Sequence, residues 1–391
     1  MNTSLIVFWK ELRENLRDRR TLANALLVGP LIGPIMFVMI INLSLNREFS
    51  KAEAPLEIPV IGAEHAPNLV AALEQMGLVP QPPVADPIRT VQEQDADAVL
   101  RIPAGFAEAW EKGEPAQVEI FYDSSQRDAH TPVNRVRTMI EQYSRQRGMM
   151  RLIARGLSPS LVQAVTLDAR DQSTPQSRAG LIFGMLPYFF VLTIFIGGMY
   201  LAIDLTAGER ERQSLEPLFA NPVARWRILL GKLGAICAFS LASLIICIVA
   251  FAFAGQFLPA DKLGMNFDLG LRFGVLALLL MLPLVVMLAA LQTLVAAFAK
   301  SYREAQTYLS ILMFVPALPA VALSVVPVKV QTWMYAVPLL AQQVGLSEAL
   351  RGARVGAPEV ALCLASGFAL ALVVTVVTAL VYRSERLAIS A

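Results

Sequence analysis

The chain has 391 residues, of which 55% are hydrophobic and 16% are charged, and its net charge is only +2. Soluble proteins average roughly 45–50% apolar and about 25% charged residues, so this composition argues against a large soluble protein. So small a net charge also argues against nucleic acid as a partner.

The N-terminal residues 1–21 predict a helix that lies on the inner surface of a membrane. Leu5, Trp9, Leu12 and Leu16 recur at helical spacing, and basic residues occupy the other faces. An ordinary charged tail is the alternative. The apolar run that follows has no small-residue cleavage site, so we expect a membrane span over residues 22–45 and not a cleaved signal peptide.

Six uncharged runs are long enough to cross a bilayer, which takes about 20 apolar residues in a helix. They are Leu22–Leu43, Ala179–Ile203, Leu233–Ala260, Phe273–Ala299, Ala305–Val328 and Val360–Tyr382. A weaker uncharged stretch within residues 330–352 contains Pro338 and several glutamines, and it predicts a re-entrant segment. Polar span residues such as Asn42, Tyr188, Gln292 and Tyr308 are expected to form helix–helix hydrogen bonds.

The distribution of positive charge predicts the orientation of the chain. With both termini in the cytoplasm, the cytoplasmic segments carry 14 Lys and Arg residues and the short outer loops carry five. The positive-inside rule favours this arrangement. The expected location is therefore a bacterial inner membrane, with several spans and with residues 46–178 outside the cytoplasm.

Residues 46–178 predict an inserted α/β or α+β domain, because they carry 14 basic and 18 acidic residues and short alternating patterns. The expected strands are Glu57–Gly62, Asp97–Ile102 and Val118–Tyr122, and the expected helices are Pro67–Met76, Ala104–Lys112 and Pro132–Arg155. Pro82 and Pro83 indicate a loop. The fold class is thus an all-α membrane domain, residues 179–391 with the first span, that carries this inserted domain.

The loop over residues 204–232 predicts a cytoplasmic docking site. Glu209, Arg210 and Glu216 supply charges, while Leu215, Leu218 and Phe219 supply an apolar face. Pro222 is expected to end a short helix there, before the basic Arg225. Such a helix suits a partner's groove, although a solvated loop is the alternative.

This stretch resembles the first cytoplasmic loop of type-2 ABC export permeases. Lys10–Arg20 resembles the N-terminal surface helix of these permeases. The other segments resemble the sodium-export-like branch of that family: Asp97–Phe106 and Gly113–Ser125 its outer domain, Lys300–Gln306 its second cytoplasmic loop, and Pro338–Gly352 its re-entrant segment. The resemblance implies a permease subunit with a soluble ABC ATPase partner and a paired permease, either a second copy or a similar chain. It also implies a second cytoplasmic contact at Lys300, Arg303 and Glu304, and export of a substrate such as Na⁺ or a drug-like compound.

Chemistry-bearing motifs are missing from the sequence. Trp226 stands where a Walker A motif ending at Gly231-Lys232 would begin with glycine, so we expect ATP and Mg²⁺ to bind the separate ATPase and no cofactor to bind this chain. Neither catalytic nor metal-ligand spacing is found, and we expect no enzyme. A secondary transporter, or a non-transport receptor or assembly factor with a working outer domain, remains an alternative.

Overall fold

The structure is a computed structural model that describes residues 3–126, 129–158, 160, 174–176, 180, 183–214, 222–258, 269–319 and 329–383. The chain forms two compact units, of which unit 1 comprises Met1–Asn42 and Gln172–Ala391 and unit 2 comprises Leu43–Asp171. Unit 2 overlaps most of residues 46–178, and the inserted domain expected there stays a prediction. Each unit has its own core.

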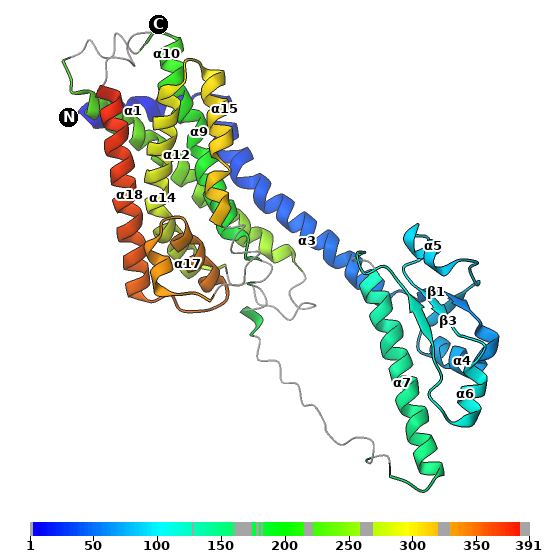
Figure 1. Cartoon of the computed structure of the whole chain (residues 1–391). Helices are drawn as coiled ribbons and strands as arrows, with labels where there is room; N and C mark the ends of the chain where they lie inside the picture. Colours follow the sequence, from blue (N-terminus) through cyan, green and yellow to red (C-terminus); the bar gives the residue numbers. More distant parts are fainter. Residues whose placement is uncertain are drawn as a thin grey trace. The chain divides into compact units, whose positions relative to one another are not determined.

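Unit 1 is helical throughout its described residues (Figure 1). Its α-helices are α1 (Thr3–Asn15), α2 (Arg19–Leu22), α3 (Gly29–Glu53, which continues into unit 2), α9 (Leu186–Ile203), α10 (Glu209–Glu211), α12 (Arg225–Ala254), α14 (Leu271–Phe298), α15 (Tyr302–Leu312), α17 (Leu340–Leu350) and α18 (Ala357–Arg383). Short π-helices are η1 (Ala23–Val28) and η5 (Asp204–Gly208), and 3₁₀ turns are η6 (Gly255–Phe257), η7 (Val315–Ala317) and η8 (Thr332–Ala336).

Five helices in the described residues are long and apolar enough to cross a membrane: Ala23–Asn46, Leu186–Glu211, Arg225–Phe257, Leu271–Phe298 and Ala357–Arg383. Each overlaps one of the apolar runs in the sequence. The chain is therefore a mostly helical membrane protein with several spans and a small sheet.

The sixth expected span, Ala305–Val328, extends beyond the described residues at its C-terminal end, and it stays a prediction. Its first part is α15, which ends at Leu312 and is followed by the 3₁₀ turn η7. Pro316 lies in this turn, and its ring would clash with the carbonyl group of Leu312 in a continuous α-helix. The proline therefore explains why the helix stops there.

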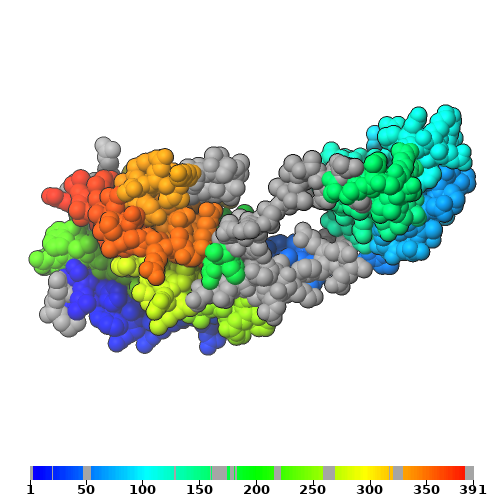
Figure 2. Space-filling view, turned by 90° about the horizontal axis from the view of Figure 1, so that it is seen from below, coloured from blue at the N-terminus to red at the C-terminus, as the bar shows by residue number. Residues whose placement is uncertain are grey.

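The segment expected to be re-entrant contains two short helices, η8 and α17. Gln342 and Gln343 of α17 are buried, and α17 contacts α9, α14 and α18. It lies at the opposite end of the helix bundle from α10 (Figure 1). Viewed from that end, the orange residues of this segment form part of the surface (Figure 2). Protein thus covers both glutamine side chains, as polar groups at membrane depth would require, and the re-entrant path itself stays a prediction.

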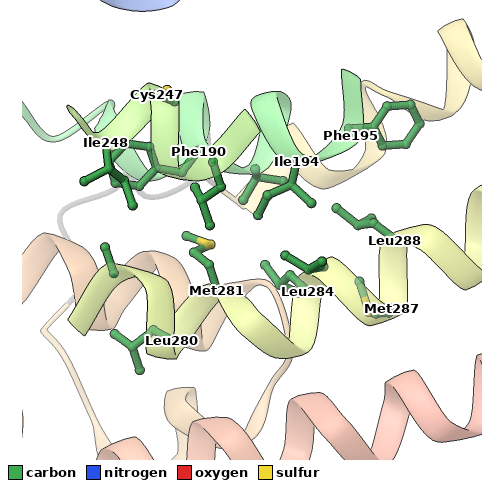
Figure 3. Packing of buried hydrophobic residues seen from close by; sticks show 14 of the residues in the cluster. Phe190, Ile194, Phe195, Cys247, Ile248, Leu280, Met281, Leu284, Met287 and Leu288 are labelled. Atoms are coloured by element: carbon green, nitrogen blue, oxygen red, sulfur yellow. The ribbon is translucent and has the colours of Figure 1, made fainter. Parts of the chain in front are cut away.

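The core of unit 1 lies between α9, α12 and α14. Apolar side chains of α9 and α12 meet those of α14 in one packed layer, shown in Figure 3, where Phe190, Ile194, Met281 and Leu284 lie close together. Small residues let the backbones approach: a Cβ atom on Gly197 would lie 2.4 Å from the Ser243 Oγ atom. Small residues at such contacts are the rule between membrane helices.

Unit 2 contains a four-stranded sheet of order β2-β1-β3-β4, formed by β1 (Leu56–Ile61), β2 (Leu78–Gln81), β3 (Val99–Arg101) and β4 (Glu119–Phe121). Strand β1 pairs in parallel with β2 and β3, while β4 pairs with β3 in antiparallel fashion. The helices are η2 (Ala63–His65), α4 (Pro67–Gln75), α5 (Pro87–Gln92), α6 (Phe106–Lys112) and α7 (His130–Ala154). An α+β unit was expected, but its second strand was not.

The core of unit 2 is apolar, and three stacked aromatic side chains pack at one part of it. Leu73 and Leu100 are completely buried between the helices and the sheet. The Trp110 ring stacks between Phe106 and Tyr143, with 5.9 Å between ring centroids on either side. Unit 2 thus has the independent core that a separate domain needs.

Candidate functional site

The candidate site lies where α9 leaves the helix bundle. The chain continues from α9 through the π-helix η5 into the short helix α10. The Arg212 Nη2 atom donates to the Asp204 Oδ1 atom at 2.8 Å, across this turn. The ion pair fixes the start of the loop that joins α9 to α12.

Glu209, the first residue of α10, is buried and not available at the surface. Its carboxylate pairs with the Lys232 ammonium group of α12, which also donates to the Leu205 carbonyl oxygen at 2.8 Å. Lys232 is completely buried. Two buried charges are tolerated because each neutralises the other and the lysine has a second acceptor.

The two other charges of α10 contact the next loop of the chain. The Arg210 Nη1 atom donates to the Ala299 carbonyl oxygen at 3.4 Å, and the Glu211 Oε2 atom accepts from the Tyr302 amide at 2.8 Å. The loop between α9 and α12 therefore lies beside the loop between α14 and α15.

The second loop is ordered by its own caps. Ser301 is the N-cap of α15, and its hydroxyl accepts from the Glu304 amide. Glu304 accepts from the Lys300 amide at 2.7 Å and from the Tyr308 hydroxyl at 2.5 Å. These hydrogen bonds, that of Tyr308 first, lower the pKa of Glu304, so this exposed carboxylate is charged near neutral pH.

The described site residues gather at one end of unit 1, as α10, α1 and the start of α15 do in Figure 1. Arg225 begins α12, and its Nη1 atom donates to the Arg383 carbonyl oxygen at 3.0 Å, which ties the loop to the end of α18. Pro222 precedes α12, and Arg303 is exposed in the first turn of α15. Leu215, Glu216, Leu218 and Phe219 lie outside the described residues.

Lys232 and Glu11 are the site residues that sequence reasoning missed. In the sequence, Lys232 directly precedes the apolar run Leu233–Ala260, and no partner was predicted for it. The signal for a buried pair was present, since Lys232 has apolar neighbours on both sides in sequence and a glutamate lies in the preceding loop. A lysine in such surroundings needs a buried acid.

The described residues offer no evident centre for bond-making chemistry. Within them, no group of three His, Cys, Asp or Glu side chains could hold a metal ion. The three cysteines are reduced, and each has an apolar environment. The arrangement suits a mechanical contact, in which charged loops at one end of a helix bundle meet another protein.

Comparison with known proteins agrees with this architecture. The model of the ABC-2 family transporter protein matches residues 21–382, and the chain therefore belongs to the ABC-2 transporter family. It is a multi-pass membrane subunit of a transporter, and membership implies association with an ABC ATPase subunit. The chain is 26% identical over 320 residues to a Bacillus subtilis (strain 168) protein called ABC transporter permease protein NatB. The aligned region covers 80% of each chain. No solved structure matches.

Proposed function

We propose that this chain is the permease subunit of an ABC exporter, which moves its substrate out of the cytoplasm with ATP that a separate subunit hydrolyses. Family membership and the similarity to a permease support the first part of this proposal. The sequence lacks a Walker A motif, which supports a separate ATPase with its own Mg²⁺.

The proposed orientation places α10 and the start of α15 in the cytoplasm and unit 2 outside it. The 14-to-five distribution of positive charge supports this choice. The bond between Arg225 and the Arg383 carbonyl group joins the start of α12 to the end of α18, which supports only that both termini lie on the same side. The ATPase, a soluble protein of the cytoplasm, would meet the permease at this end.

The observation that carries the proposal is the joining of the two loops. Arg210 and Glu211 of one loop bind Ala299 and Tyr302 of the other, and these loops connect three of the membrane helices. A partner that moves one loop must therefore move the other. That is the mechanical property an ATP-driven transporter needs, because ATP is hydrolysed outside the membrane.

The assembly is proposed as two permeases with two ATPases. One chain offers six spans at most, and the export permeases it resembles work with twelve. The second permease is either a second copy or a similar chain. Na⁺ and drug-like compounds are the cargo candidates, and they come from the family resemblance alone.

The test is to replace Leu218 or Phe219 with Asp. The apolar face of residues 208–227 is proposed to fill a groove on the ATPase, so a buried unpaired charge would cost several kcal/mol there. We expect each variant to insert in the membrane normally but to lose the co-purifying ABC ATPase. The measurement is the amount of ATPase retained on the affinity-tagged permease.

Gln126→Asp in unit 2 is the control for this experiment, because Gln126 is far from the loop in sequence and is polar already. It should retain the ATPase at the wild-type level. Full retention by both loop variants would place the contact elsewhere, with residues 300–306 as the next candidate.

A further inference from the structure

Lys232 is the centre of a buried charge cluster that joins three helices. It is completely buried in α12, it pairs with Glu209 of α10, and it donates to the Leu205 carbonyl oxygen. A buried ammonium group donates up to three hydrogen bonds. The two that are identified both go to the stretch that leads from α9 into the proposed coupling loop.

Glu11 of α1 is the second acid of this cluster. Only 3% of its surface is exposed, and its Oε1 atom accepts from the Lys10 Nζ atom at 3.2 Å. Burial raises the pKa of this carboxyl group most; the charges of Lys10 and Lys232 oppose that effect, and the charge of Glu209 adds to it. Asn15, one turn further along α1, is also buried and donates to the Glu11 carbonyl oxygen at 2.9 Å. The inner face of α1 therefore carries two buried polar side chains beside apolar ones such as Phe8, whereas the apolar side chains of Leu5 and Trp9 are exposed.

Two glycines allow α1 to lie directly on α12. A Cβ atom on Gly231 would lie 2.6 Å from the Val7 Cβ atom and 2.7 Å from the Ser4 carbonyl oxygen. A Cβ atom on Gly234 would lie 3.0 Å from the Phe8 ring. The close approach is what brings Glu11 into the range of Lys232.

Among the described residues of the cluster, Lys232 supplies the buried positive charge and Lys10 supplies an exposed one. Glu11 and Glu209 are both acids and both buried, and Lys232 is the buried cation that faces them. Lys10 also attracts Glu11, but its side chain is 58% exposed, so water screens its contribution. Removing the Lys232 charge would leave two buried acids facing each other.

We infer that Lys232 is a positioning residue that locks α1 to the base of the coupling loop, so that α1 and α10 move as one body. The inference rests on the proposed function, because it says which permease element receives the movement of the ATPase. The lock gives α1 a second role besides lying on the membrane surface. Movement of the ATPase that reaches α10 is then transmitted to α1 as well.

The test uses the position of α1 as its readout and needs only the permease. Val7→Cys places a cysteine where α1 packs against Gly231. The rate at which a water-soluble maleimide labels this cysteine in membrane vesicles measures how accessible the contact is. We expect Lys232→Met to raise the rate of labelling at least tenfold. The chain without the Val7 substitution gives the background from Cys237, Cys247 and Cys363.

Two variants separate a lost lock from a misfolded protein. The exchange of charges in Glu209→Lys with Lys232→Glu restores the ion pair and should return labelling towards the wild-type rate. Lys112→Met, which removes an exposed lysine in unit 2, should change nothing. Unchanged labelling in Lys232→Met, or no rescue by the exchanged pair in a protein that purifies as well as wild type, would overturn the inference.

The mechanical role is tested on the complex with the ABC ATPase. In wild type we expect the labelling rate at Val7→Cys to differ between the nucleotide-free complex and the complex trapped with ATP and vanadate. Lys232→Met should abolish that difference while the ATPase is still retained. A difference that persists in Lys232→Met contradicts the role. Failure of the wild-type permease to bind any ATPase would instead refute the proposed function, and the permease-only test would still decide the lock.

Discussion

Polar side chains in the helix bundle are accommodated by direct contact with a neighbouring helix. Gln292 is completely buried, and its Nε2 atom donates to the Phe195 carbonyl oxygen of α9 at 2.7 Å. Asn42 likewise donates to the Phe257 carbonyl oxygen at 3.3 Å. The expected helix–helix role is confirmed for these two residues, whereas Tyr308 bonds within its own helix.

Gly198 should matter more for stability than the buried amide beside it. A Cβ atom there would lie 2.6 Å from the Ser240 Oγ atom and 2.8 Å from the Gln292 Oε1 atom, so Gly198→Val should cost about 1–3 kcal/mol through overpacking. Gln292→Met keeps the volume and loses one hydrogen bond, and should cost less than about 1 kcal/mol. Thermal unfolding of the detergent-solubilised protein measures both, and a larger loss for Gln292→Met would contradict this ranking.

The docking of α1 should weaken as pH rises, and Glu11 is the reason. Burial raises the pKa of Glu11, against the opposing effects of Lys10 and Lys232 and together with the repulsion of Glu209. The buried Tyr382 side chain of α18 is also titratable, but a phenol stays neutral in this pH range. Since the docked state binds the proton more tightly, docking is favoured at low pH and loses stability as pH rises from about 4.5 through the raised pKa.

The measurement is the labelling of Val7→Cys as a function of pH, corrected for the reactivity of a free thiol. Wild type should show faster labelling at the upper end of the range. Glu11→Gln cannot ionise, so it should remain docked and lose the pH dependence. An identical pH profile in Glu11→Gln would show that another group controls docking.

At the scale of single elements, unit 2 should behave as an independent domain. A fragment of residues 54–158 contains the whole sheet and its apolar core. Within it, Leu100→Ala should cost about 2–5 kcal/mol, because Leu100 is fully buried in β3 and truncation leaves a cavity.

The control for that substitution is Val79→Ala in the neighbouring strand β2. Val79 is 41% exposed, and its truncation should change the free energy of unfolding by about 0.5 kcal/mol or less. Urea unfolding of the fragment compares the two. Equal losses would mean that the core lies elsewhere.

Elements with a strong local pattern were predictable from the sequence, and the others were not. Strand β1 differs from the expected range by one residue at each end and helix α4 by one residue at its C-terminal end, because alternation and helical periodicity were clear there. The prolines at 82 and 83 indicated a loop correctly but hid β2, which ends just before them, and α5, which Asp86 caps soon after. Tertiary pairing with β1 supplied what the β2 sequence lacked.

The candidate site likewise has a part that could be predicted from the sequence and a part that could not. The charged loop could be recognised from composition, since charges held between two apolar runs are conspicuous. The partners of those charges could not, because Glu11 and Lys232 are 221 positions apart and meet only when α1 lies on α12. Helical spacing predicted that α1 exists but did not reveal that Glu11 and Asn15 are buried on its inner face.

At the scale of the whole molecule, the central claim is that this permease works with an ABC ATPase. Its loops are bonded to each other at one end of the bundle, and α1 and α18 end there too. Under the proposed function, the ATPase contacts several of these elements at once. The substrate path through the paired permeases is a separate question.

Native mass spectrometry of the affinity-purified complex tests that claim most directly. The permease would be expressed with an ABC ATPase encoded beside its gene and released from the membrane in detergent. The account predicts an assembly of two permease chains, identical or similar, and two ATPase chains. A permease that is released intact, with its spans folded, and that carries no ATPase would contradict it.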